Sequence, residues 1–156
     1  MKEIKLQRGM VTQVDDEDFN ELNKYKWFGH KERNTTYAWR HRYLGVRQYR
    51  MVKMHQQIMG IKGGDHRDGN GLNNQKYNLR PCTSQQNSMN VRPRVGCSSR
   101  FKGVSYHKQN DRWRASLTLN GKMVSLGCYA TEEETALIYN KKSAELFGEF
   151  ARPNVI

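Results

Sequence analysis

The sequence predicts an α+β fold in which short antiparallel strands form small sheets with a few helices between them. Three observations predict it. Residues 1–60 alternate apolar and polar side chains over short runs, as half-buried strands do. Residues 64–80 contain several turn dipeptides, which indicate a chain reversal. Residues 99–156 contain three short strand patterns and then one helical pattern.

The 156-residue chain is strongly basic, with 27 lysines and arginines against 15 acidic residues and a formal net charge of +12. A basic surplus of this size favours polyanionic partners, nucleic acid first among them. No apolar run approaches transmembrane length, so we expect no membrane partner. The start of the chain is charged, which argues against a signal peptide. The three cysteines form no CxxC pair, which favours a reducing cytoplasm over a disulfide framework or a zinc ribbon.

The positive charge is concentrated in two blocks that are interleaved with aromatic residues. The first block covers residues 31–53 and includes Arg33, and the second covers residues 92–122 and includes Arg94. Either block alone is equally well explained as a solvated sheet face. Two such blocks on either side of a segment with catalytic residue types favour DNA binding.

The first 60 residues are expected to form short strands around one helix. A strand is predicted over residues 10–14, and the acidic run that follows supplies the first turn of a helix that reaches about Tyr25. Further strands are predicted over residues 27–28, 36–41 and 47–54.

The segment of residues 64–80 carries residue types suited to hydrolysis. Asp65 and His66 precede the turn dipeptides, and the chain is expected to return through residues 77–80 as a second strand. A capping box then predicts a helix that carries Asn87 in about its first turn. Two strands and a helix in this order form a ββα unit, in which Asp65 and Asn87 would face a common point beside His66.

These residue types fit metal-assisted cleavage of phosphodiester bonds. A carboxylate and an amide oxygen are hard ligands, which Mg²⁺ accepts together with water and substrate phosphate. A histidine that titrates near neutral pH takes a proton from the attacking water. The metal stabilises charge on the phosphate and on the leaving oxygen. An isolated Asp-His pair before a glycine turn is more often a turn cap, so the prediction depends on the whole pattern.

That pattern is Asp65-His66-x-Asp68-Gly69-Asn70-x-Leu72-Asn73-Asn74-x-x-x-Asn78-Leu79-Arg80, followed by Gln86-Asn87. It resembles the core of the HNH endonucleases found in phage genomes and mobile introns, over roughly residues 8–90. The resemblance implies a ββα-metal (His-Me finger) nuclease fold in which His66 is the general base. It implies that Asp65 and Asn87 bind the metal and that Asn78 braces the loop that orients the histidine. Because the third motif residue is Asn87 rather than histidine, Mg²⁺ (or Mn²⁺) is implied and no zinc is expected.

The last third of the chain is predicted to form a three-stranded antiparallel sheet packed on one helix. The strands are expected over residues 101–107, 112–119 and 122–128. Asn120-Gly121 is a strong signal for a two-residue hairpin between the second and third strands. Thr131 and Glu134 form a capping box that opens a helix, and this helix is expected to end at Gly148.

Several short motifs in this part resemble the Apetala/ethylene-response-factor (AP2/ERF) DNA-binding module. They are Ser99-Arg100-Phe101-Lys102-Gly103-Val104, Trp113-x-Ala115, Leu126-Gly127-x-Tyr129 and Tyr139-Asn140. The resemblance covers about residues 99–154 and implies a sheet that lies in the major groove of double-stranded DNA. It does not carry over the plant target sequence, because Ser105, Met123 and Ser125 stand where plant members have base-reading residues. The alternative is a small module that only packs on the nuclease.

The residues predicted to contact DNA are basic or polar side chains of the N-terminal strands, the central turn and the exposed face of the C-terminal sheet. They are Arg40, Arg42, Arg67, Arg80, Arg100, Lys102, Tyr106, Lys108, Arg112, Arg114, Ser116 and Thr118. For Arg67 and Arg80 a purely solvated role is equally open.

The sequence therefore predicts a site-preferring DNA endonuclease that makes one nick per site and acts as a monomer or homodimer, in the host-cell cytoplasm if a phage encodes it. Its predicted parts are a nuclease domain over 1–90 (a β-rich part, 1–53, and the ββα core, 54–90), a linker over 91–98 and a DNA-binding domain over 99–156. One alternative is a catalytically inactive DNA-binding regulator with a nuclease-like fold. Another is an RNA-binding protein, since basic sheets with exposed aromatic rings also stack single-stranded bases.

Overall fold

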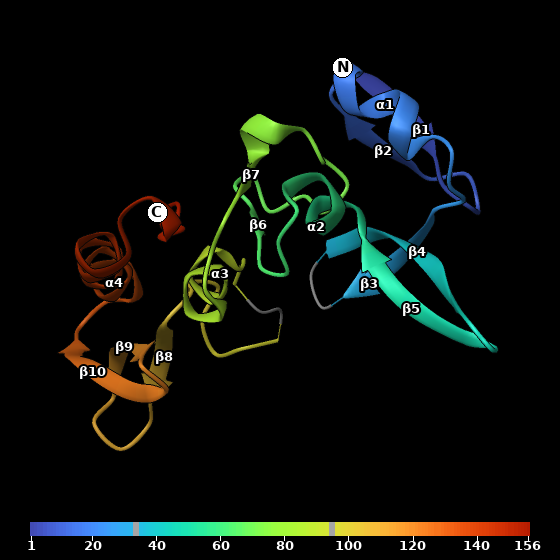
Figure 1. Cartoon of the computed structure of the whole chain (residues 1–156). Coiled ribbons are helices and arrows are strands. Elements are labelled where there is room, and N and C mark those ends of the chain that lie inside the picture. Colours follow the sequence, from blue (N-terminus) through green and yellow to red (C-terminus); the bar gives the residue numbers. More distant parts are fainter. Residues whose placement is uncertain (33–34, 94–95) are drawn as a thin grey trace. The chain divides into compact units, whose positions relative to one another are not determined.

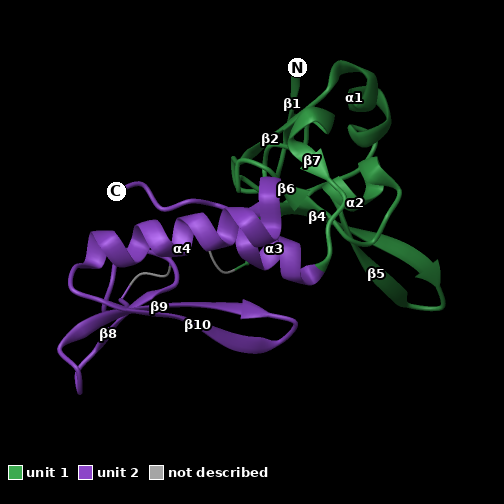
Figure 2. Ribbon diagram, turned by 90° about the vertical axis from the view of Figure 1, so that its left-hand side faces the viewer, with its two compact units in different colours: residues 1–83 green, residues 84–156 purple. Residues whose placement is uncertain are grey.

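The computed structural model describes residues 1–32, 35–93 and 96–156 and has a mixed α+β architecture with several small antiparallel sheets (Figure 1). Arg33 and Arg94 of the two basic blocks lie outside the described residues. The chain divides into two compact units, Met1–Thr83 and Ser84–Ile156, and each is described by itself (Figure 2). The predicted α+β class is confirmed at this level.

The first unit begins with a hairpin that covers one side of its core. Strands β1 (Lys2–Lys5) and β2 (Val11–Val14) pair antiparallel, and helix α1 (Asp16–Leu22) follows. Trp27 is buried in the core, and its indole nitrogen donates to the carbonyl oxygen of Leu22 at 2.8 Å. The helix ends at Leu22, three residues earlier than predicted, because this carbonyl serves the turn and the tryptophan instead of a further helical turn.

A three-stranded meander follows and leads into the second helix. It consists of β3 (Phe28–Glu32), β4 (Thr35–Gly45) and β5 (Gln48–Lys53), in the order β3-β4-β5. Val46 and Arg47 form the tight turn between β4 and β5, and both have positive φ angles. Helix α2 (Met54–Met59) starts where β5 ends, and Met54 anchors it in the core of the unit.

Two very short strands frame the segment that the sequence singled out. β6 (Asp65–His66) pairs antiparallel with β7 (Leu79–Arg80), and a 3-10 turn, η1 (Lys76–Asn78), precedes β7. The predicted return strand over 77–80 is therefore half turn and half strand. The connecting loop is tied to β2, because Gln13 N–H donates to Leu72 O and Asn74 N–H donates to Gln13 O, both at 2.8 Å.

The second unit contains the predicted three-stranded sheet packed on one helix. Helix α3 (Ser84–Asn90) comes first, followed by β8 (Val104–His107), β9 (Arg112–Leu119), β10 (Lys122–Tyr129), α4 (Glu132–Phe147) and η2 (Gly148–Phe150). The strands lie in the order β10-β9-β8, and α4 packs along the sheet in contact with all three strands (Figure 2). Ala115 and Leu117 of β9 pack with Tyr139 of α4 in the core. This architecture is confirmed.

Local signals predicted most element ends in this unit. Asn120 and Gly121 both have positive φ angles in the predicted hairpin turn. The Thr131 side chain accepts from Glu134 N–H at 3.1 Å, and α4 ends at Phe147 with Gly148 as its C-cap. Strand β8 starts later than predicted, because Gly103 takes a φ of +75° against the ring of Tyr139 and breaks the extended chain.

Helix α3 belongs to the second unit by its contacts. It packs on α4 and η2, and the carbonyl of Met89 accepts from the backbone N–H of Arg152. The second compact unit therefore begins at Ser84, where α3 starts. The domain limits that the sequence indicates remain a prediction. None of the described helices is both long and apolar enough to cross a bilayer.

Candidate active site

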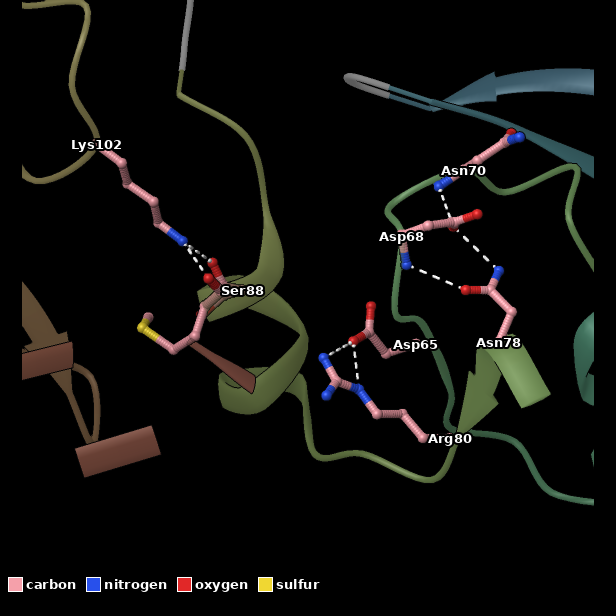
Figure 3. Close-up of polar contacts among 8 residues, drawn as sticks. Asp65, Asp68, Asn70, Asn78, Arg80, Ser88 and Lys102 are labelled. Atoms are coloured by element: carbon pink, nitrogen blue, oxygen red, sulfur yellow. Dashed lines mark hydrogen bonds and ion pairs between the residues drawn. The ribbon is translucent and has the colours of Figure 1, made fainter. Parts of the chain in front are cut away.

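Asp65 is buried and paired with an arginine on the neighbouring strand. The strand register sets Asp65 directly opposite Arg80. Nε and Nη2 of Arg80 donate to Oδ2 of Asp65 at 2.9 and 2.7 Å, and the two residues are only 5% and 4% exposed (Figure 3). Pairing of this kind stabilises a carboxylate that would otherwise be costly to bury. The structure thus pairs Arg80 with the carboxylate of Asp65. A contact of Arg80 with DNA phosphate remains a prediction.

His66 lies beside Asp65 and is enclosed by two other rings. It is 3% exposed, and its ring centroid is 5.5 Å from that of Tyr37 and 4.9 Å from that of His55. Burial lowers the pKa of His66, although the hydrogen bond with Asn74 and the charges of Asp68 and Asp65 act in the opposite direction. A neutral imidazole at physiological pH is the form that a general base requires.

Asn78 closes the loop between β6 and β7. Its Oδ1 accepts from the backbone N–H of Asp68 at 3.1 Å, and its Nδ2 donates to Asp68 Oδ1 at 3.0 Å (Figure 3). The same Nδ2 also donates to Asn73 O at 2.8 Å. Asp68 in turn accepts from the N–H of Asn70 at 2.7 Å and from Asn73 Nδ2 at 2.9 Å. Burial raises the pKa of Asp68, but these hydrogen bonds outweigh it and lower the pKa below its ordinary value. The turn after His66 is therefore held by a closed network of amides around one carboxylate.

His55 is the buried neighbour of the catalytic candidate. Burial, with the charges of His66 and Lys53 adding to it, lowers its pKa to about 3. His55 lies on α2, and its ring is in edge-to-face contact with that of His66. With its pKa lowered to about 3, this histidine is neutral at physiological pH.

Asn87, the second predicted metal ligand, lies half-buried on α3. Asp65 belongs to the first unit and Asn87 to the second, so their meeting at one ion remains a prediction. Among the described residues, no group of three or more His, Cys, Asp and Glu side chains gathers around a common point. The donor chemistry of a buried carboxylate and an amide oxygen fits a hard divalent cation that takes its other ligands from water and phosphate.

A basic groove of about 640 Å³ lies on the first unit between the β4–β5 hairpin and α2. It is lined by four cations, Arg40, Arg42, Arg50 and Lys62, and none of its described lining residues is acidic. Arg40 is held in place, because its guanidinium stacks at 3.9 Å on the ring of Tyr25 and its Nε donates to a glutamine of α2 at 2.9 Å. The sequence predicted Arg40 and Arg42. Lys62 was missed because only the fold brings the end of α2 beside β5.

The predicted DNA-contacting residues of the sheet in the second unit fall into two groups. Arg112 and Thr118 are exposed on β9, and Arg114 and Ser116 are half-buried on the same face, opposite Ala115. The Nε of Arg114 is buried and has no hydrogen-bond partner among the described atoms. These four side chains form a polar sheet face.

The other predicted contacts in this unit, and Arg67, are arranged differently. Tyr106 packs edge-on against Trp113 with 5.2 Å between ring centroids, and Lys108 is exposed at the turn after β8. Arg100 contacts Glu133 at 3.3 Å. The Lys102 ammonium group donates to the carbonyl of Ser88 at 3.1 Å (Figure 3), and burial lowers its pKa to about 8. Arg67 is exposed in the first unit.

Sequence reasoning missed the groups that contact the ring of His66. Tyr37 comes from β4 and Asn74 from the loop that is tied to β2, and both reach His66 only through the tertiary fold. The double asparagine was the available signal, and nothing local distinguishes which of the two faces the site.

Comparison with known proteins gives three matches. The chain is 47% identical over 92 residues to the uncharacterized HNH endonuclease L560 of Acanthamoeba polyphaga mimivirus, which covers 59% of this chain and 46% of L560. It is 33% identical over 112 residues to protein 3.8 of Escherichia phage T7, covering 67% of this chain and 92% of that protein. A stretch of 52 residues, 32% of the chain and 15% of the relative, is 38% identical to an AP2-like ethylene-responsive transcription factor of Arabidopsis thaliana, At1g16060. The chain thus spans about half the length of L560. No protein-family profile matches the chain, and no solved structure matches it.

Proposed function

Since the chain is a homologue of an HNH endonuclease and belongs to one family with protein 3.8 of phage T7, we propose that it is an endonuclease that hydrolyses phosphodiester bonds in DNA. One observation carries the proposal. Asp65 and His66 lie side by side, buried on β6, and the turn that follows them is closed by Asn78. Hydrolysis of a phosphodiester bond needs a carboxylate to bind a metal ion, a neutral imidazole to accept a proton and a rigid loop to hold both in place, and β6 and its turn supply all three.

In the proposed reaction His66 accepts a proton from the water that attacks the phosphorus. Its lowered pKa keeps the imidazole free of a proton at physiological pH. The contacts of Asn78 with Asp68 and Asn73 keep the turn from shifting, so that the ring keeps its position when substrate enters. Arg80 fixes the carboxylate of Asp65 in one orientation through two hydrogen bonds.

Asp65 and Asn87 would hold a divalent cation, Mg²⁺ or Mn²⁺, at this site. This requires α3 of the second unit to complete a ββα unit with β6 and β7 of the first. The ion, when bound, supplies stabilisation of negative charge on the phosphate and on the leaving oxygen. The protein residues supply the ligand oxygens, the base and the rigid turn.

The basic groove of the first unit and the polar sheet face of the second would hold the duplex. The groove offers Arg42, Arg50 and Lys62 to phosphates, while Arg40 is already stacked on Tyr25. The sheet face offers the exposed side chains of Arg112 and Thr118. A single site of this kind makes one nick, so a double-strand break would need a homodimer or a second encounter.

Nicking of supercoiled plasmid in the presence of Mg²⁺ tests the proposal. We expect His66→Ala to lower the rate by about 10² to 10⁴-fold, the usual contribution of a positioned general base. His30→Ala is the matched control, because His30 is an exposed histidine of β3. Equal cutting by the wild type and His66→Ala would contradict the role of His66. Tight binding of DNA with no nicking by the wild type would favour a non-catalytic DNA-binding regulator instead.

A further inference from the structure

The side chain of Asn74 contacts the imidazole of His66, and we infer that Asn74 fixes the tautomer of this histidine, with the proton on Nε2 and the lone pair on Nδ1. Asn74 is thus a positioning residue that acts on the ring itself, whereas Asn78 acts on the backbone of the turn. The inference rests on the proposed function only where it names Nδ1 as the atom that takes the proton from water.

Asn74 is fully buried and held from several sides. Its backbone N–H donates to Gln13 O at 2.8 Å, which ties it to β2. Its Nδ2 donates to Thr12 Oγ1 at 2.8 Å and to Gly71 O at 3.4 Å, and its Oδ1 lies 3.3 Å from His66 Nε2. Each polar atom of the side chain therefore has a partner, and the amide cannot rotate without breaking these contacts.

The neighbours decide which atom of the amide faces the histidine. The hydroxyl oxygen of Thr12 lies 2.7 Å from Leu72 O, and only the threonine proton can join two oxygens at that distance. The hydroxyl is thus an acceptor toward Asn74, which requires the amide nitrogen on that side. A rotated amide would also set its oxygen against the carbonyl oxygen of Gly71, and neither could donate. Oδ1 therefore faces His66.

The protonation of the ring follows from this contact. A carboxamide oxygen only accepts hydrogen bonds, so His66 Nε2 must carry the proton. A neutral imidazole has a single ring proton, which leaves the lone pair on Nδ1. The rings of Tyr37 and His55, with centroids 5.5 and 4.9 Å away, pack against the imidazole and restrict its rotation. The direction of the lone pair is thus set by the amide and by the aromatic neighbours together.

Nitrogen NMR on the full-length protein, labelled with ¹⁵N in its histidine rings, tests the inference directly. Long-range proton–nitrogen spectra at a pH where the imidazole is neutral distinguish a protonated ring nitrogen from an unprotonated one. The His66→Gln variant identifies the signals of His66 by their absence. We expect a protonated Nε2 and an unprotonated Nδ1. A protonated Nδ1 in the wild type would overturn the inference.

Substitution of the asparagine gives the second arm of the test. Asn74→Leu removes the acceptor at similar volume, and we expect mixed tautomer signals for His66. We also expect kcat for nicking to fall roughly 10- to 100-fold, as for other groups that orient a functional histidine, with KM unchanged. Asn20→Leu makes the same change at an exposed position of α1 and should alter neither readout. A wild-type tautomer signal in folded Asn74→Leu would overturn the inference.

A third variant covers the case in which Asn74→Leu does not fold. Thr12→Val removes only the hydroxyl that orients the amide, and we expect it to weaken the preference for the Nε2 proton in the same spectra. An unchanged preference in Thr12→Val would count against the inference. The spectra need neither DNA nor metal, so they decide the tautomer even if the protein cuts no DNA, in which case only the proposed function fails.

Discussion

His55 and His66 are two buried imidazoles in edge-to-face contact, and both have a lowered pKa. For both rings burial is the largest cause, and for His55 the neighbouring charge of His66 adds to it. Two positive charges at this distance would repel each other in a desolvated site. The folded protein therefore favours the neutral form of both rings. Because of this preference, the free energy of unfolding depends on pH.

The first prediction concerns stability in acid. The unfolded chain protonates His55 near its ordinary pKa of 6.5, whereas the folded protein does so only near about 3. The unfolded state thus binds more protons between these two pH values. The contribution of neutral His55 to the free energy of unfolding is therefore complete above pH 6.5 and is lost as the pH falls toward about 3. The slope is at most ~1.4 kcal/mol per pH unit for one group.

Urea unfolding at a series of pH values measures this slope. His55→Gln should flatten it without abolishing it, because the lowered pKa of His66 contributes with the same sign. His30→Gln replaces an exposed histidine and should retain the wild-type slope. If His55→Gln and the wild type lose stability equally between these pH values, the buried neutral state of His55 is refuted.

Single residues also mark the limit of what sequence could predict for the site. Asp65, His66 and Asn78 lie in one short segment with turn signals between them, so the pattern itself indicated the group. The contacts of His66 with Tyr37 and of Asp65 with Arg80 depend on strand register and on packing between distant segments. Such contacts leave no local signature, and only the fold supplied them.

At the scale of elements, glycine positions separate two physical causes of strain. Gly103 and Gly121 have nearly equal φ angles of +75° and +77°, but their surroundings differ. A Cβ on Gly103 would lie 2.1 Å from ring atoms of Tyr139, whereas one on Gly121 would meet nothing within 4 Å. The first glycine is required by packing of the sheet on α4 and by its backbone angle, the second by its backbone angle alone.

The second prediction follows from this difference. Gly121→Ala should cost roughly 1 kcal/mol of unfolding free energy, because only the backbone is strained. Gly103→Ala should cost several times more, since the ring of Tyr139 is itself buried in the core and cannot move aside freely. Urea unfolding followed by circular dichroism compares the two variants. Equal losses would contradict the close packing of Gly103 against the ring of Tyr139.

Element boundaries were predictable where the signal is local and not where it is tertiary. Asn120-Gly121 and the cap at Thr131 act within a few residues, and both turned out as the sequence indicated. Helix α1 ends early because the indole of Trp27 takes the carbonyl of Leu22, and β8 starts late because Tyr139 occupies the space beside Gly103. Both of these causes involve side chains of other segments.

At the scale of the whole molecule, part of the surplus positive charge gathers in the basic groove of the first unit. The basic groove of the first unit collects Arg42 and Arg50 from paired strands, which the charge pattern indicated, and Lys62 from beyond α2, which it did not. Charge along a sequence thus predicted the class of partner, while the fold determined which cations share a surface.

The third prediction is a change in salt dependence of DNA binding. Each neutralised phosphate contributes about 0.9 to the slope of log K against log salt, so Arg42→Ala combined with Arg50→Ala should reduce the slope by ~1.8. Fluorescence anisotropy with a duplex at several salt concentrations measures it. The control combines Lys5→Ala with Lys24→Ala, which removes the same charge from two exposed lysines that do not line the groove. An equal change of slope in the control would refute the groove as the binding surface.

Asp65 of the first unit and Asn87 of the second are proposed to bind one metal ion and so to act as one site. The most direct measurement is the rate of plasmid nicking in Mg²⁺ for the wild type, Asp65→Asn, Asn87→Ala and the double variant, with Ser88→Ala as the control on the exposed side of α3. We predict that each single change removes most of the activity, that the double variant is little worse than either, and that Ser88→Ala cuts normally. Wild-type nicking by Asn87→Ala, or losses that multiply in the double variant, would contradict a shared site.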